Sequence, residues 1–184
     1  MNIKKITTVL CYLSNKLGAI DKLKTIKLLY YIDKQHLLEY GRFITNDTYV
    51  KMPYGPVPTK ILDIINEPEI NLFDEDKKYF NEYISIQLDD RKRTITSKKI
   101  PDITELSKSE IKTIENILST YGDYKGGELI DITHQEKAWQ NAAHNDNLAI
   151  EDMISELPED KRKKLLIYLQ ENTETKKFFH ALQA

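Results

Sequence analysis

Four histidines are the side chains of this chain best suited to hold a metal, and they lie at positions 36, 134, 144 and 180. None belongs to a His-Glu-x-x-His motif, which would place two ligands on one helical face. Asp33 and His36 are three residues apart, so on a helix they share a face, and His134 could add a third ligand. The alternative is that Asp33 and His36 hydrogen-bond to each other or to the backbone of a nearby loop. We expect this alternative, and therefore neither a metal nor a cofactor.

Nucleophilic and phosphate-binding motifs are also missing from the sequence. The single cysteine, Cys11, lies between leucines at helical spacing with no base beside it, so we interpret it as a small core residue. There is no Gly-x-Ser-x-Gly motif, and the six glycines form no Gly-rich loop of the Rossmann or P-loop kind. The acidic groups at 74–76 and 89–90 lie in predicted turns, where solvated carboxylates are common. The sequence therefore predicts a protein that is not an enzyme.

Eleven tyrosines and one tryptophan offer a different chemistry, the aromatic contacts that dominate protein interfaces. Three prolines in the segment 53–58 fix extended backbone and predict a stiff, exposed loop, on which an aromatic ring loses little entropy when it binds. The alternative is that the rings of Tyr54 and Trp139 complete the core and that Gly55 only allows a backbone angle. We predict a partner-binding surface made of Tyr49, Tyr54, Gly55, Pro56 and Trp139.

Two basic runs, Arg91–Arg93 with Lys98-Lys99 and Lys161–Lys164, could contact phosphate. Acidic residues flank both runs, and such a run is usually a solvated face. The net charge of −2 gives no general attraction to nucleic acid or to an anionic membrane. We therefore expect neither a membrane nor a nucleic acid as the partner, and keep the basic segment 91–99 as an alternative site for nucleic acid.

Periodicity predicts the elements that must position these residues. Apolar residues at three- and four-residue intervals indicate an amphipathic helix over 3–17, which Gly18 ends. The segment 21–40 begins at a possible N-cap, Asp21, and ends at Gly41. Its apolar residues cover nearly every face, so we expect it to be the central, buried helix of the fold.

Short extended segments are predicted around that helix. Residues 83–88 and 93–96 alternate apolar and polar side chains and form a predicted hairpin, to which 48–52 could add a third strand. Residues 69–82 have no clear pattern, although Leu72, Phe73, Tyr79 and Phe80 must be buried. Pro58 suits the first position of a helix that ends near Asn66.

Helices are predicted for most of the second half. Ser107 and Glu110 form a capping box for a helix that Gly122 ends, with Leu106 and Ile111 as its hydrophobic staple. Further short helices are predicted over 128–133, 148–156, 159–171 and 174–182. The predicted fold class is α+β, predominantly α-helical, with a central buried helix and a small antiparallel β-sheet or hairpin.

The 184 residues suffice for a single domain, 1–184, and 40% hydrophobic with 30% charged residues is typical of a folded globular protein. No apolar run approaches the ~20 residues needed to cross a bilayer, and the N-terminal residues lack the apolar core of a signal peptide. A lone cysteine fits a reducing compartment. We expect a cytoplasmic protein.

Residues 27–36 contain a Leu-Leu-Tyr helix, residues 40–47 a Gly-Arg-x-Ile-Thr turn and residues 54–57 the sequence Tyr-Gly-Pro-Val. In this order, the three segments resemble one known family, the Panacea or SocA-like antitoxin domain. Leu129, Thr133-His134 and the Trp139 segment continue the resemblance, which covers most of residues 5–145. Residues 146–184 are less clearly covered, and we expect them to form a C-terminal helical extension.

The resemblance implies a mostly helical domain of bacteria and their phages that binds and neutralises a cognate small protein toxin. One branch of the family acts as a proteolytic adaptor that delivers its toxin to a protease, so a cellular protease is a possible second partner. No catalytic residue comes with the family. We predict an antitoxin, with a proteolytic adaptor or a nucleic-acid-binding regulator acting through residues 91–99 as the alternatives.

Overall fold

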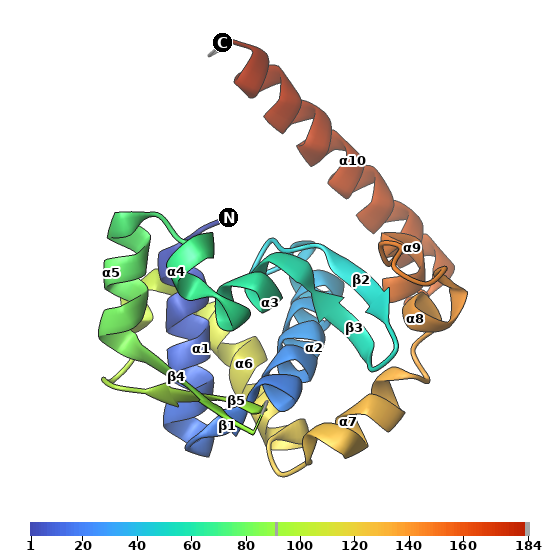
Figure 1. Ribbon diagram of the computed structural model, residues 1–184. Helices are drawn as coiled ribbons and strands as arrows, with labels where there is room; N and C mark the ends of the chain where they lie inside the picture. Colours follow the sequence, from blue (N-terminus) through green and yellow to red (C-terminus); the bar gives the residue numbers. More distant parts are fainter. Residues whose placement is uncertain (91, 183–184) are drawn as a thin grey trace.

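The computed structural model describes residues 1–90 and 92–182 and is predominantly helical, as predicted (Figure 1). The α-helices are α1 (Ile3–Leu17), α2 (Lys22–Tyr40), α3 (Thr59–Asn66), α4 (Pro68–Asn71), α5 (Asp74–Tyr83), α6 (Lys108–Tyr121), α7 (Gly126–Thr133), α8 (Lys137–Asn141), α9 (Ile150–Met153) and α10 (Glu159–Leu182), and η1 (Ile103–Glu105) is a 3₁₀ turn. The strands are β1 (Ile20–Asp21), β2 (Tyr49–Met52), β3 (Gly55–Pro58), β4 (Ile84–Asp89) and β5 (Lys92–Ser97).

Helix α2 lies at the centre of the fold, which confirms the prediction of a central buried helix (Figure 1). It packs against α6, α7 and β3, and its run of apolar residues from Leu28 to Ile32 is buried. The side chain of Asp21 caps its N-terminus by accepting from the amide of Lys24, and Gly41 ends it in the left-handed conformation. Both boundaries follow from local sequence.

The strands form two separate antiparallel pairings, a three-stranded sheet in the order β1-β5-β4 and the hairpin β2–β3. The predicted hairpin is β4–β5, but its third strand is β1 and not 48–52, so that part of the prediction is wrong. Strand β2 pairs with β3 on one side and contacts the segment 145–148 through backbone hydrogen bonds on the other. Both of its edges are therefore occupied within the fold.

The segment 53–58 is not the exposed loop that the sequence predicts. Only Pro53 and Tyr54 form an exposed turn, whereas Gly55–Pro58 is a buried strand. The dihedral angle φ of proline is compatible with extended backbone, and the prolines at positions 56 and 58 lie on a short two-stranded ribbon where few ladder bonds are needed. Pro58 occupies the N-cap position of α3, one residue before the first helical position that the sequence predicts for it.

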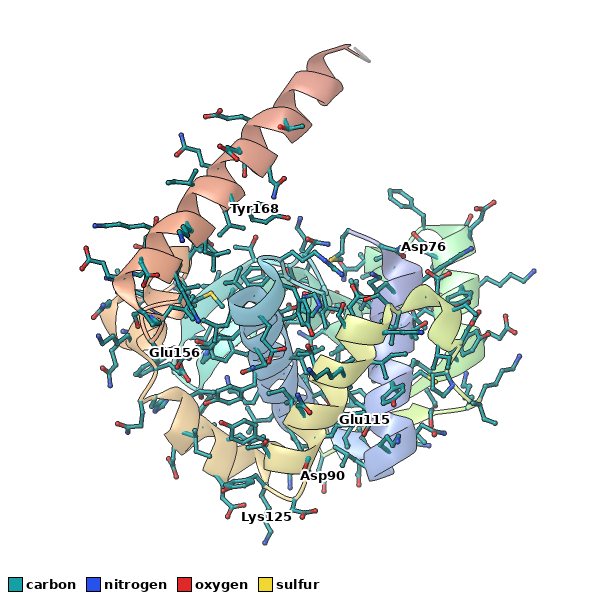
Figure 2. All side chains as sticks on the ribbon, turned by 180° about the vertical axis from the view of Figure 1, so that it is seen from behind. Asp76, Asp90, Glu115, Lys125, Glu156 and Tyr168 are labelled. Atoms are coloured by element: carbon teal, nitrogen blue, oxygen red, sulfur yellow. The ribbon has the colours of Figure 1, made fainter. Side chains whose placement is uncertain are left out.

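Helices α4 and α5 occupy the segment 69–82 that had no clear pattern. Leu72 and Phe80 are buried as expected, but Phe73 is 88% exposed and the prediction for it is wrong. The acidic run from Asp74 to Asp76 forms the first turn of α5 and not a loop turn, and Figure 2 labels Asp76 of this turn. Carboxylates are favourable there because they face the positive end of the helix dipole.

Helix α6 begins with the predicted capping box. The hydroxyl of Ser107 accepts from the amide of Glu110, and the carboxylate of Glu110 accepts from the amide of Ser107. The buried Glu110 also pairs with Lys5 at 2.8 Å and Arg42 at 2.7 Å. Burial alone would raise its pKa, but the hydrogen bonds from Lys5, Ser107 and Arg42 lower it to about 2. This carboxylate therefore joins α1, α6 and the segment after α2.

Helix α10 is one continuous helix, so the predicted break between 171 and 174 is wrong. Thr173, near that point, donates its hydroxyl to the carbonyl of Leu169 within the helix, and this bond satisfies the polar group without interrupting it. The first turns of α10 pack on the rest of the molecule and the later ones extend away from it (Figure 1). Across the described residues, no helix combines the length and apolar character needed to cross a membrane.

Candidate protein-binding site

The hairpin β2–β3 presents Tyr54 at its tip. Met52 pairs with Gly55, so Pro53 and Tyr54 form a two-residue turn. The side chain of Tyr54 is exposed and the residue is 68% accessible, whereas β3 behind it is buried. The turn is short, closed by the pairing of the hairpin and followed by a buried strand. Tyr54 therefore loses little backbone entropy when its ring binds a partner.

Gly55 is required at this turn for two independent reasons. Its φ of +96° lies in the region that side chains rarely adopt. A Cβ atom there would also lie 2.5 Å from Oγ1 of Thr133 and 2.8 Å from Nζ of Lys27. The missing side chain lets β3 approach α2 and α7 closely, so Gly55 fixes the turn and does not itself present a contact.

Lys27 lies fully buried on α2 beneath this strand. Its ammonium donates to the carbonyl of Pro56 at 2.9 Å, and the side chain forms no ion pair within the described part of the chain. Burial lowers the pKa of Lys27 to about 7. The sequence did not reveal this residue, because nothing in a helical pattern shows that a lysine faces the interior.

The Lys27→Met variant is expected to remove a pH dependence of stability. The unfolded lysine keeps its proton up to pH ~10.4, whereas the folded one loses it near 7. Between these values the unfolded chain binds more protons, so the free energy of unfolding of the parent rises with pH by up to about 1.4 kcal/mol per unit. Urea denaturation at several pH values from about 7 to 8.5 measures this slope.

The exposed Lys60→Met variant is the matched control and should keep the slope of the parent. Equal slopes in the parent and in Lys27→Met would show that the buried lysine does not lose its proton in this range.

Asp33 and Tyr49 form a second buried network next to Lys27. The carboxylate of Asp33 accepts from the amides of Ile44 at 2.7 Å and Thr45 at 3.0 Å, from the hydroxyl of Thr45, and from the hydroxyl of Tyr49 at 2.8 Å. Burial raises the pKa of Asp33, and these hydrogen bonds oppose the shift. Tyr49 is 3% exposed, so its side chain joins the hairpin to α2 inside the molecule and is not available to a partner.

The three residues considered as metal ligands each have another role. Asp33 holds the loop after α2, and Nδ1 of His36 lies 2.9 Å from the carbonyl of Arg42 in the same loop. Burial lowers the pKa of His36, which favours the neutral ring. His134 stacks on Trp139 with ring centroids 3.9 Å apart. Within the described residues, no three such side chains gather into a possible metal site.

Trp139, on α8, packs beside the tip of the hairpin and bonds to it. Its indole N–H donates to the carbonyl of Met52 at 3.0 Å, and Nζ of Lys51 lies 4.6 Å from its ring centroid. The residue is half-buried, with one face against His134. Trp139 thus combines both interpretations of the sequence, because it supports the turn that carries Tyr54 and still reaches the surface.

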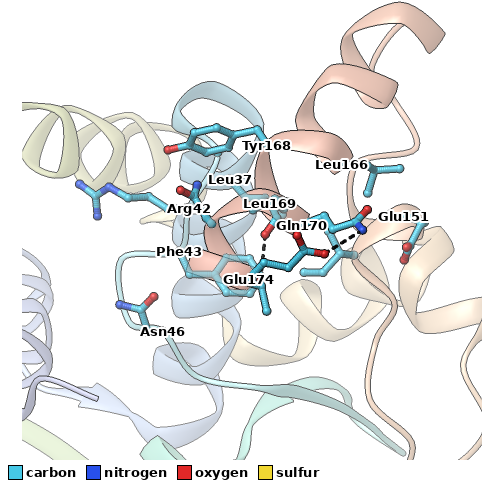
Figure 3. A pocket seen from close by; sticks show the side chains of 14 residues that line it. Leu37, Arg42, Phe43, Asn46, Glu151, Leu166, Tyr168, Leu169, Gln170 and Glu174 are labelled. Atoms are coloured by element: carbon cyan, nitrogen blue, oxygen red, sulfur yellow. Dashed lines mark hydrogen bonds between the residues drawn. The ribbon is translucent and has the colours of Figure 1, made fainter. Parts of the chain in front are cut away.

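A groove of about 750 Å³ lies on another part of the surface, between α10 and the loop after α2 (Figure 3). It is lined by residues of α2, that loop, α9 and α10, namely Leu37, Gly41, Arg42, Phe43, Asn46, Ile150, Glu151, Leu166, Tyr168, Leu169, Gln170, Asn172, Thr173 and Glu174. A Cβ at Gly41 would lie 2.9 Å from the ring of Tyr168, so this glycine also allows α10 to approach. The sequence alone gives no sign of this groove, because its two walls are far apart in the chain.

The basic runs are partly engaged by the fold. Lys98 donates to the carbonyl of Asn81, and Lys99 forms an ion pair with Glu82. Arg91 lies outside the described residues, and Lys163 in the second run pairs with Glu159. Cys11 is buried as predicted, and burial raises the pKa of its thiol to about 11.

Four of the five predicted partner-binding residues lie in the hairpin β2–β3 and Trp139 packs beside it from α8, but few of the five are accessible. Tyr49, Gly55 and Pro56 are buried, and they form the support of the site. Tyr54 is exposed and Trp139 is half-buried. A contact surface at this hairpin would therefore consist of the Tyr54 turn and the edge of Trp139.

Comparison with known proteins gives one match. The family model described as antitoxin SocA-like, Panacea domain, matches residues 26–140, from α2 to α8. Neither a curated protein nor a solved structure matches the chain significantly.

Proposed function

Because the chain belongs to the SocA-like antitoxin family with a Panacea domain, we propose that it binds and neutralises a small protein toxin. The observation that carries this proposal is the family match, which includes α2, the hairpin and α7–α8. Those elements contain the buried networks of Lys27 and Asp33. The polar groups of these networks bond to the fold itself, so they stabilise the scaffold that carries the exposed Tyr54 turn.

We place part of the contact surface at the Tyr54 turn. Tyrosine is common among residues that dominate binding energy, and Tyr54 is held by a closed hairpin with Trp139 behind it. The groove beside α10 offers a second surface, largely outside the matched residues. A cytoplasmic site of action agrees with a toxin made in the same cell.

The Tyr54→Ala variant tests this placement. We expect it to lower the affinity for the toxin encoded beside this gene by about tenfold or more, because an exposed aromatic anchor is lost. Rescue of cells that express the toxin should fail at matched protein levels, and the melting temperature should stay within about two degrees of the parent, since an exposed side chain contributes little to stability.

Phe73→Ala, at another exposed aromatic residue, is the control and should rescue fully. Full rescue by Tyr54→Ala would place the interface elsewhere, with the groove beside α10 as the next surface to test. If no neighbouring gene product is toxic or binds the chain, the antitoxin proposal itself is wrong.

The same cells distinguish the mode of neutralisation. A stoichiometric inhibitor leaves the toxin present in a complex, whereas a proteolytic adaptor shortens its half-life, which a chase after blocked synthesis measures. DNA binding that falls steeply with salt would instead favour a regulator acting through β4–β5.

A further inference from the structure

A polar pocket of about 320 Å³ lies between α2 and α6, away from the hairpin tip. Tyr31, Lys34 and Gln35 line it from α2, and Tyr121 lines it from the end of α6. Glu136 before α8 and Glu156 before α10 complete it. This volume is at the lower end for ligand pockets, and it suits a single side chain better than a nucleotide.

The pocket carries an excess of negative charge. Nζ of Lys34 lies 2.5 Å from Oε2 of Glu136 and 3.5 Å from Oε2 of Glu156, so one ammonium faces two carboxylates. The side chain of Glu156 is 56% exposed, whereas that of Glu136 is 16% exposed. Lys34 therefore pairs mainly with Glu136, and the carboxylate of Glu156 remains available to bind a ligand. Figure 2 shows Glu156 near the base of α10.

Aromatic rings and an unsatisfied hydroxyl form the inner part of the pocket. The rings of Tyr31 and Tyr121 stack with centroids 4.5 Å apart and an interplanar angle of 18°. Tyr31 is 5% exposed, and its buried hydroxyl has no hydrogen-bond partner among the described residues. Buried polar groups are nearly always hydrogen-bonded, so this hydroxyl indicates a partner that the described residues do not supply.

We propose that this pocket binds an arginine side chain of the partner protein. A guanidinium group matches the available carboxylate of Glu156 and stacks on tyrosine rings, and it would donate to the buried Tyr31 hydroxyl only after that side chain moves. A phosphate or carboxylate ligand would instead meet the excess of negative charge. The assignment to a partner protein rests on the proposed antitoxin function, whereas the preference for a cation rests on the pocket alone.

The first experiment is a titration of the full chain with N-acetyl-arginine amide, followed by NMR. We expect saturable shifts of the side-chain amides of Gln35 and Asn116, both of which line the pocket, with a Kd in the millimolar range because one side chain binds alone. Glu156→Gln should weaken binding by about fivefold or more. This change lies at an exposed, loosely held carboxylate, so the fold is retained.

Glu171→Gln, at an exposed carboxylate of α10 outside the pocket, is the matched control and should bind the probe like the parent. Shifts without saturation, or equal binding by parent and Glu156→Gln, would overturn the proposal. So would an equal response to N-acetyl-glutamate amide, because it would show no preference for a cation.

The toxin assay then tests the partner. Weaker neutralisation by Glu156→Gln than by Glu171→Gln supports an arginine of the toxin in the pocket. Full neutralisation by Glu156→Gln overturns that assignment and leaves the antitoxin function intact. If the parent neutralises no toxin, the proposed function is wrong, and the arginine titration still decides whether the pocket binds a cation.

Discussion

Replacing Asp33 by alanine is expected to lower the free energy of unfolding by about 3–5 kcal/mol, because several buried donors lose their acceptor at once. The two amides of Ile44 and Thr45 have no other partner within the described residues, and the single hydroxyl hydrogen of Tyr49, which can point to Asp33 or to the carbonyl of Leu29, loses the carboxylate as an acceptor. Urea denaturation of parent and variant at neutral pH measures the change.

Asp63→Ala is the matched control, since Asp63 is exposed on α3, and we expect a change within about 0.5 kcal/mol. A loss below about 1 kcal/mol for Asp33→Ala would show that the loop after α2 is held by packing and not by this carboxylate.

Leu29→Ala is expected to destabilise the protein by about 2–5 kcal/mol, because Leu29 is fully buried on the central helix and its truncation leaves a cavity. The backbone of Leu29 also accepts from the hydroxyl of Tyr49, so collapse around the cavity would disturb the attachment of the hairpin. The midpoint of urea denaturation should fall while the slope m stays unchanged.

Leu88→Ala on β4 provides the comparison. Leu88 is 63% exposed, and its truncation should change stability by less than about 0.5 kcal/mol. Equal effects at the two leucines would mean that α2 is not the centre of the core.

Family membership and the buried networks fit together. The segments that resemble the family form α2, the loop after it, the hairpin and α7–α8. Many of their side chains are buried in the fold. Lys27, Asp33 and Gly55 are each held by the fold, so they are suited to preserve a scaffold. Tyr54, the groove beside α10 and the Glu156 pocket lie at the surface, where recognition of a particular partner can vary.

Features with local causes could be predicted from the amino-acid sequence alone. A helix begins where a side chain can satisfy its first amides and ends where a residue can turn left-handed, so Asp21, Gly41 and the Ser107 capping box set boundaries correctly. The all-round apolar pattern of 21–40 likewise indicated the central helix, and a resemblance of short motifs was enough to identify the family.

Which residues meet across the chain depends on how the elements pack in three dimensions. The proline segment became a buried strand because β2 and α2 cover it. The burial of Lys27 depends on Gly55, 28 positions later, because a side chain there would collide with the lysine. The Glu156 pocket joins residues more than a hundred positions apart, such as Tyr31 and Glu136. Periodicity reports which face of an element is apolar, but it does not report which element covers that face. The packing of β3 against α2 buries Gly55–Pro58 and leaves Tyr54 exposed at the turn of the hairpin.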